Sequence, residues 1–301
     1  MKDLLTIKDL STKKIFGLLD LAKKIKKAPE KFSSHLKGKT LALLFRKTST
    51  RTRISFESGM YQLGGSPLYL DWTTTNLHLG SIADEIKCIS LYVDLIVARV
   101  YKHENLEEMV EFSRVPIING LSDKFHPCQI LSDLMTIQEL FPDTFRDIKV
   151  SFIGDGNNVC NSLIIGCIKL GISILVATPE NYEPEQGVVE WAKAQKNCQC
   201  FKLSHDPREV VKNADIVYTD TFVSMGQENE KEKRLTTFKP YQINDSLLKH
   251  AHKSPFIMHC LPAHRGVEIT DKVIESKNSV VFQQAENKIH LQKAILLDFL
   301  L

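Results

Sequence analysis

The chain has 301 residues, of which 43% are hydrophobic and 25% are charged, and its formal net charge is +3 at pH 7. This composition is close to that of soluble globular proteins, so collagen-like, disordered and coiled-coil chains are excluded. The length predicts two domains of ordinary size. The basic run at residues 23–27 is interpreted as the solvated side of a helix, because nucleic-acid-binding domains concentrate more positive charge on one face.

The sequence also bears on the compartment. It shows neither a signal-peptide apolar core at its start nor an apolar run of transmembrane length. Its seven cysteines are an odd number and include no Cys-x-x-Cys pair. We therefore expect a cytoplasmic protein with reduced thiols and without nucleic-acid or membrane partners.

Short apolar runs alternate with segments of helical periodicity, a pattern typical of parallel sheets with helical crossovers. The expected strands are residues 40–45, 93–98, 115–118, 148–153, 172–177, 215–219, 256–258 and 279–282. The expected helices include 50–63, 130–141, 159–170 and 285–301. We predict two doubly wound, parallel-sheet α/β domains that face each other across a cleft and are linked by helices. The first is 1–132, completed by the C-terminal helix 285–301, and the second is 133–284.

Polar clusters follow the carboxyl ends of six expected strands, where open α/β sheets bind ligands. The clusters begin at Arg46, Arg99, Gly120, Gly154, Asp220 and His259. So many polar clusters at strand ends indicate an active site, and this indication does not depend on resemblance to any family.

The first of these clusters, residues 46–53, reads Arg-Lys-Thr-Ser-Thr-Arg-Thr-Arg and opens an amphipathic helix. Backbone N–H groups, the positive end of the helix dipole and guanidinium groups together suit a phosphate dianion. Ordinary Ser and Thr caps with surface arginines are the alternative, but the position directly after a buried strand favours anion binding.

The other clusters are ambiguous by themselves. Residues 154–158 resemble the start of a dinucleotide fingerprint, but Val159 replaces its third glycine, so a tight turn that presents Asn side chains is preferred. His126 suits a packed histidine as well as a catalytic one. Cys260 by itself suits a small buried thiol. A nucleophilic role would need a base partner, and His259 would point to the opposite side of a continuing strand. The histidines around Cys260 match no standard zinc spacing, so no metal is expected.

The motifs together resemble the aspartate/ornithine carbamoyltransferase family over nearly the whole chain. Residues 45–53 are similar to its carbamoyl-phosphate motif, and 126–129 (His-Pro-Cys-Gln) to its His-Pro-x-Gln motif. Residues 220–227 and the His-Cys-Leu-Pro sequence at 259–262 resemble the ornithine branch. The aspartate branch has a His-Pro-Leu-Pro-Arg type of sequence at the latter place.

The resemblance implies an enzyme that transfers the carbamoyl group of carbamoyl phosphate to the δ-amine of L-ornithine, giving L-citrulline and phosphate. It implies a homotrimer without a cofactor, whose first domain binds carbamoyl phosphate and whose second binds ornithine. The implied contacts to carbamoyl phosphate are Ser49, Thr50, Arg51, Thr52, Arg99, His126, Gln129, Cys260, Leu261 and Lys288. The implied ornithine contacts are Asn158, Asp220, Ser224 and Met225, and the implied catalytic residues are Arg99, His126, Asp220 and Cys260.

The resemblance also implies that the loop at 224–226 closes. Independently of the resemblance, the basic residues at 231–234 indicate an exposed loop or a helix start. The group that accepts the amine proton stays open. The direction of the reaction, arginine biosynthesis or citrulline breakdown, stays open as well.

Two departures from the family pattern stand out. Lys288 replaces an Arg that contacts carbamoyl phosphate in the family; Lys keeps the charge but loses the bidentate fork, so weaker binding is expected. Residues 76–87 are shorter than the family's loop, which reaches into the neighbouring subunit. The contribution of His78 to a shared site is therefore left open.

Alternative functions follow from particular residues. A carbamoyltransferase for putrescine or an N-acylated ornithine is nearest, although Asp220 and Ser224 suit the zwitterionic end of free ornithine. An aspartate enzyme is disfavoured by Cys260. A non-catalytic trimeric binding protein is kept open by Lys288 and the short loop, and a dehydrogenase rests only on the turn at 154–156.

Overall fold

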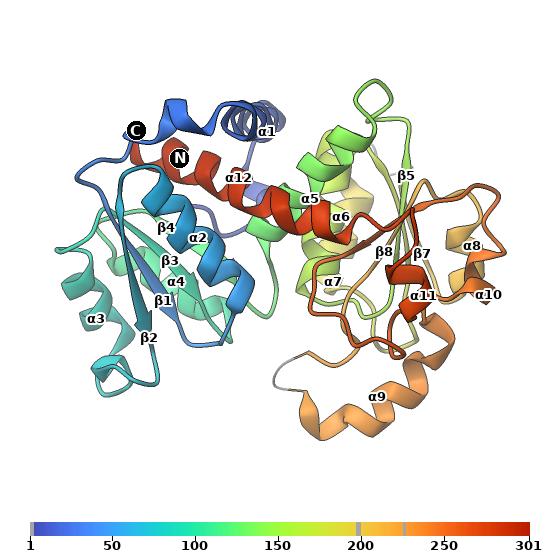
Figure 1. Ribbon diagram of the computed structural model, residues 1–301. Coiled ribbons are helices and arrows are strands. Elements are labelled where there is room, and N and C mark those ends of the chain that lie inside the picture. Colours follow the sequence, from blue (N-terminus) through green and yellow to red (C-terminus); the bar gives the residue numbers. More distant parts are fainter. Residues whose placement is uncertain (1–2, 197–199, 225–226) are drawn as a thin grey trace. The chain divides into compact units, whose positions relative to one another are not determined.

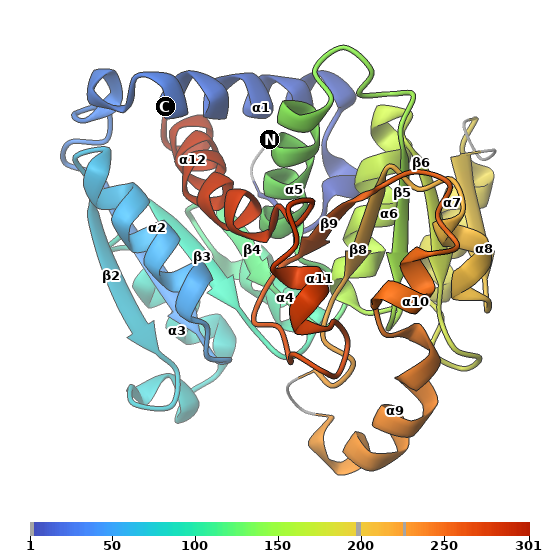
Figure 2. The same ribbon diagram turned by 45° about the vertical axis from the view of Figure 1, so that its right-hand side comes forward.

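The computed structural model describes residues 3–196, 200–224 and 227–301. It divides into two compact units (Figures 1 and 2). Unit 1 comprises Met1–Met135 and Glu286–Leu301, and unit 2 comprises Thr136–Ala285. Each unit contains one parallel sheet with helical connections, so the predicted α/β class is confirmed. Among the described residues, none of the helices combines the length and apolar character needed to cross a membrane.

Unit 1 is built on a four-stranded sheet of order β2-β1-β3-β4. The strands are β1 Thr40–Phe45, β2 Ser66–Asp71, β3 Leu95–Arg99 and β4 Ile117–Leu121. The helices are α1 Thr12–Lys27, α2 Thr50–Gln62, α3 Ile82–Ile89 and α4 His103–Phe112, together with most of α5 Pro127–Leu140 and α12 Val281–Leu300. Helix α2 covers one face of the sheet, and α3 and α4 cover the other (Figures 1 and 2). Because both faces are covered, β1 and β3 are near-continuous apolar runs.

Helices α1 and α12, from opposite ends of the chain, lie side by side in unit 1 (Figure 1). Lys14 pairs with Asp298, and Lys26 Nζ donates to Asn287 Oδ1 at 2.7 Å. The core side of α1 is apolar, while Lys24 is exposed. The basic run is therefore a helix edge that faces solvent and α12, as interpreted from the sequence.

Unit 2 is built on a five-stranded sheet of order β7-β6-β5-β8-β9. The strands are β5 Lys149–Ile153, β6 Ser173–Ala177, β7 Phe201–Ser204, β8 Ile216–Thr219 and β9 Phe256–His259. The helices are α6 Asn158–Leu170, α7 Gln186–Ala194, α8 Pro207–Val211, α9 Lys231–Phe238, α10 Asp245–Leu248 and α11 Asp271–Ile274. Apolar side chains of α8 to α11 pack into one cluster with one face of the sheet, and α6 contacts β6 and α7. Short 3-10 helices occupy Ile7–Asp9, Pro29–Phe32, Asn76–His78, Glu228–Glu230 and Lys239–Tyr241.

The strand order of each sheet reverses once. The reversal lies between β1 and β3 in unit 1, and between β5 and β8 in unit 2. Open parallel sheets bind ligands outside the carboxyl ends of their strands at such a point. Topology therefore predicts one ligand site in each unit.

The expected strand at 279–282 is wrong. Ser279 forms only an isolated bridge with Ile257, and α12 already begins at Val281. Two edge strands, β2 and β7, were not predicted. Both are only partly buried and so lack a continuous apolar run.

Candidate active site

The predicted anion-binding segment forms the start of helix α2, directly after β1. Ser49 is the N-cap residue, and its Oγ accepts the N–H of Thr52 at 3.4 Å. Thr52 is buried and Arg51 is partly buried. The first turn of the helix thus combines backbone N–H groups, hydroxyls and a guanidinium, which is the chemistry that a phosphate group requires.

The arginines of this segment have different surroundings. The backbone N–H of Arg46 donates to the carbonyl of Arg99 at 2.8 Å, which joins the ends of β1 and β3 at the reversal point. The guanidinium of Arg53 lies 3.4 Å from the ring centre of Tyr69, and its Nε pairs with Glu57 at 3.1 Å. The guanidinium of Arg53 is therefore held by Tyr69 and Glu57.

Four further candidates of unit 1 are buried polar side chains. Arg99 is 6% exposed, His126 5%, Gln129 3% and Lys288 4%. Lys288 Nζ donates to Gln129 Oε1 at 2.8 Å. Burial, together with the positive charges of Lys288 and Arg99, holds the pKa of His126 well below its usual range. His126 is therefore neutral at pH 7, and the positive charge that suits an anionic ligand resides on Arg99 and Lys288.

Cys128, in the His-Pro-Cys-Gln motif, is a buried residue that stabilises the fold. Burial raises the pKa of Cys128 to about 12, and its Sγ donates to the carbonyl of Asn119. A thiol with such a pKa is inert at neutral pH.

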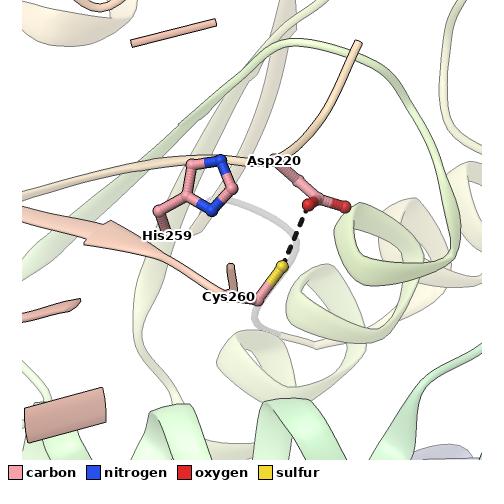
Figure 3. A group of neighbouring side chains, drawn as sticks. All are labelled: Asp220, His259 and Cys260. Carbon is pink, nitrogen blue, oxygen red and sulfur yellow. Dashed lines mark hydrogen bonds between the residues drawn. The ribbon is translucent and has the colours of Figure 1, made fainter. Parts of the chain in front are cut away.

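In unit 2 a second group of candidates gathers at the ends of β5, β8 and β9. Cys260 Sγ donates to Asp220 Oδ1 at 2.9 Å (Figure 3). The other carboxylate oxygen of Asp220 accepts from Asn157 Nδ2 at 2.8 Å. Asp220 is therefore held between the end of β9 and the start of α6, at the reversal point of the sheet.

Asn157 was expected only as part of the turn at 154–158, and the ligand contact was assigned to the neighbouring Asn158, which is partly buried at the first turn of α6. The Oδ1 atom of Asn157 caps α6 by accepting the N–H groups of Val159 and Cys160, at 3.0 and 3.1 Å. This cap directs Nδ2 toward Asp220. An Asn directly before an apolar helix is an N-cap signal that could have singled it out.

His259 does not point away from Cys260 as expected. Strand β9 ends at His259 and the chain turns, so that one donor atom each of Asp220, His259 and Cys260 lies within 4.8 Å of the others (Figure 3). The group is compact enough for a metal ion. However, His259 Nδ1 accepts the N–H of Leu261 at 2.8 Å, and Nε2 lies 3.2 Å from Glu268 Oε1. Both ring nitrogens of His259 are thus already engaged.

The same contact defines what Leu261 can offer. Its N–H is donated to His259, so its carbonyl is the backbone group that can accept a hydrogen bond from a ligand. Its φ of 57° places it in the left-handed region. Ser224 is partly exposed and its N–H donates to Gln227 Oε1, whereas Met225 and Gly226 lie outside the described residues.

Arg234 is a second residue that sequence reasoning misjudged. Residues 231–234 were expected to form an exposed loop or a helix start, and α9 does begin at Lys231, but the side chain of Arg234 is 4% exposed and pairs with Asp155 at the end of β5. Its Nε donates to the carbonyl of Phe222 at 2.7 Å, and its guanidinium lies 4.8 Å from the ring centre of Tyr182. Arg234 therefore anchors the segment between Asp220 and Ser224 to β5.

The buried Asp155 predicts a pH effect on stability. Burial raises its pKa from the ordinary 3.8 to about 6, although Arg234 lowers it. The folded state thus binds this proton more tightly than the unfolded state. The contribution of the bound proton to the stability of the fold is complete below pH 3.8 and is lost as the pH rises through 6. Asp155→Asn has no titrating carboxyl group at this position. As the pH rises from 4 to 7, the free energy of unfolding of the wild type should therefore fall by up to about 3 kcal/mol relative to that of Asp155→Asn.

Denaturant unfolding at the two pH values measures this difference. Asp206→Asn is the control of opposite sign, because the hydrogen bond from Arg208 lowers the pKa of Asp206. A pH difference in Asp155→Asn equal to that of the wild type would contradict the expectation.

The shortened loop also lies in unit 1. His78 Nδ1 lies 2.7 Å from the carbonyl of Thr75, and the ring is exposed. Together with Arg46, Trp72 and Tyr101 it lines a pocket of about 570 Å³. The loop is thus folded against the strand ends of its own unit.

Comparison with known proteins gives a consistent result. The family model described as the carbamoyl-P binding domain of aspartate/ornithine carbamoyltransferase matches residues 2–139, and the Asp/Orn binding domain matches residues 146–299. A curated relative from Pyrococcus furiosus, named "Ornithine carbamoyltransferase, anabolic", is 50% identical over 300 residues, which are 98% of this chain and 95% of the relative. The ornithine carbamoyltransferase of Bacillus subtilis is 49% identical over 298 residues, 98% of this chain and 92% of the relative. The solved ornithine carbamoyltransferase from Pyrococcus furiosus matches with a TM-score of 0.92 and 49% identity, over 98% of this chain and 96% of that one.

Proposed function

This chain belongs to the aspartate/ornithine carbamoyltransferase family, and on that premise we propose that it carbamoylates the δ-amine of L-ornithine with carbamoyl phosphate. The products are L-citrulline and phosphate. The observation that carries the choice of ornithine is the Cys260–Asp220–Asn157 group at the reversal point of unit 2. A carboxylate held there suits the cationic α-amino group of an amino acid.

Carbamoyl phosphate binds to unit 1. Ser49, Thr50, Arg51 and Thr52 hold the phosphate at the start of α2, where the N–H groups and the helix dipole favour a dianion. Arg99, His126 and Thr52 donate hydrogen bonds to the carbamoyl oxygen. Because His126 is neutral, it acts as a hydrogen-bond donor, and Arg99 supplies the charge.

Ornithine binds to unit 2. Asp220, Asn158, Ser224 and Met225 hold its α-amino and carboxylate groups, and Cys260 faces the δ-amine. The Leu261 carbonyl accepts from the carbamoyl amino group.

The reaction forms one bond and breaks another. The unprotonated δ-amine attacks the carbamoyl carbon, and negative charge develops on the carbamoyl oxygen, where preorganised donors are most effective. The C–O bond to phosphate then breaks and phosphate leaves as an anion that is already bound. The amine nitrogen loses one of its two protons, which ends on the departing phosphate to give hydrogen phosphate, and much of the rate enhancement comes from holding two small substrates together.

A direct test compares amine substrates. Purified protein is incubated with carbamoyl phosphate and ornithine, putrescine or N-acetylornithine, and the carbamoylated products are quantified by chromatography. We expect citrulline formation with a kcat/KM at least about 100-fold above that of the other amines, since either analogue leaves the groups that hold the zwitterionic end unpaired. A preference for another amine would reassign the substrate, and no product from any amine would leave only a binding protein.

Lys288 provides a prediction on carbamoyl phosphate. In Lys288→Arg the KM for carbamoyl phosphate should fall about 3- to 10-fold and the KM for ornithine should stay constant, because a guanidinium can donate to two oxygens at once. Steady-state kinetics with each substrate varied in turn provide the measurement. Lys293→Arg, a change at another buried lysine of α12, is the matched control. An unchanged KM for carbamoyl phosphate in Lys288→Arg would show that bidentate hydrogen bonding at position 288 does not contribute to binding.

We also propose a cytoplasmic homotrimer that works toward citrulline, as arginine biosynthesis requires. The direction is supported by the word "anabolic" in the name of the Pyrococcus furiosus relative. Exposed apolar residues of unit 1, among them Tyr61, Leu68, Leu79 and Tyr92, support an interface on that unit. Light scattering should give a mass three times that of the chain.

A further inference from the structure

We propose that Asp133, a buried carboxylate on α5 with no part in the steps above, is a positioning residue that orients the amide of Gln129. Through Gln129 it makes the site select a carbamoyl group over an acetyl group. The proposal rests on the proposed function, because it concerns how the same donor substrate is recognised.

The contacts form a chain of three buried side chains in unit 1. Gln129 Nε2 donates to Asp133 Oδ1 at 2.9 Å, one helical turn further along α5. Lys288 Nζ donates to Gln129 Oε1 at 2.8 Å. Asp133 is fully buried, and Gln129 and Lys288 are 3% and 4% exposed. Water is thus largely excluded from the three groups.

The chemistry of the two neighbours settles which way the amide points. A carboxylate only accepts hydrogen bonds and an ammonium group only donates them. Rotation of the Gln129 amide by 180° would set its oxygen against Asp133 and its NH2 group against Lys288. Two hydrogen bonds would become two repulsions, and these are strong where the local dielectric constant is low.

The orientation has a consequence for the ligand. Helix α5 begins at Pro127, directly after His126, so Asp133 draws the amide nitrogen away from the helix start. The amide oxygen lies on the side of Lys288. It has two lone pairs, one of which accepts from Lys288, and we assign the second to an N–H of the carbamoyl group.

Acetyl phosphate has a methyl group in place of this NH2 group. A site built to accept a hydrogen bond from a substrate rejects an analogue that lacks the donor, because a buried acceptor is then left unpaired. In this scheme the discrimination depends on Asp133, although Asp133 touches neither ligand.

The test is Asp133→Asn, which can donate as well as accept and so removes one of the two repulsions that disfavour the rotated amide. The KM for carbamoyl phosphate is measured together with the inhibition constants of acetyl phosphate and inorganic phosphate. We expect the KM to rise about 10-fold, with both inhibition constants changing less than about 2-fold. The selectivity ratio, acetyl phosphate Ki over carbamoyl phosphate KM, thus falls about 10-fold. A purely structural role would weaken all three ligands together, and an unchanged ratio overturns the proposal.

A second variant keeps the test decisive if Asp133→Asn does not fold. In the double variant Gln129→Glu with Asp133→Asn, the asparagine donates to one carboxylate oxygen and the other faces Lys288. We expect this exchange to keep the wild-type selectivity ratio within about 3-fold, because the acceptor on the ligand side is restored; a larger fall contradicts the assignment. Wild-type citrulline formation is measured in parallel. Its absence would refute the proposed function, whereas citrulline formation with an unaltered Asp133→Asn ratio would refute only the role of Asp133.

Discussion

Replacing Arg99 with methionine is expected to lower kcat for citrulline formation by about 10³-fold, near the upper end for loss of one preorganised donor to a developing oxyanion. The guanidinium is buried at the end of β3, and its charge adds to burial and to Lys288 in lowering the pKa of His126. Since His126 is neutral, the variant loses positive charge at the carbamoyl oxygen that no neutral donor replaces. Rapid-quench measurement of the first turnover would show the loss in the chemical step.

Two controls separate this effect from a general loss of positive charge. Arg99→Lys keeps the charge and should be intermediate. Arg53→Met removes an arginine of the same sequence segment that stacks on Tyr69 and pairs with Glu57, so its kcat should stay within about 3-fold of the wild type. Equal losses in Arg53→Met and Arg99→Met would contradict the assignment.

The second large effect is expected for Asp220→Asn. This variant keeps the shape of the side chain but removes the carboxylate that accepts from Cys260 and Asn157. We expect kcat/KM for ornithine to fall about 10²- to 10³-fold, since removing one partner of a buried charge pair costs about 3–5 kcal/mol. The KM for carbamoyl phosphate should change little, and steady-state kinetics with each substrate varied separate the two constants.

Asp271→Asn is the matched control, because Asp271 is an exposed aspartate of the same unit that pairs with Arg265. Its kinetics should match those of the wild type within about 2-fold, as for other exposed ion pairs. If Asp220→Asn kept more than a tenth of the wild-type kcat/KM for ornithine, Asp220 would not be the principal contact of the α-amino group.

Several features could be predicted from the sequence because they depend on local order. Central strands of a parallel sheet are buried on both faces, so β1, β3, β5 and β8 are short apolar runs that can be recognised without a structure. Polar residues directly after such runs must lie at one edge of the sheet. The start of α2 was correctly predicted in the same way, from hydroxyl residues that follow a strand and open an amphipathic helix.

Other predictions failed where the local pattern is ambiguous. The edge strands β2 and β7 are half exposed and lack a continuous apolar signature. The apolar pair at 280–281 suits a strand and a buried first helical turn equally well, and α12 adopts the latter.

The sequence by itself determined the fold class, the family and the polar clusters at the strand ends, because apolar runs and contiguous motifs carry this information locally. Only the tertiary structure decided that Asn157 donates to Asp220, and that His259 turns toward Glu268 and Leu261. It also decided that Arg234 is buried against Asp155, and which way the Gln129 amide points between Lys288 and Asp133. Half of these contacts join residues distant in the chain, and the geometry of all of them depends on how strands and helices pack, which a linear pattern does not record.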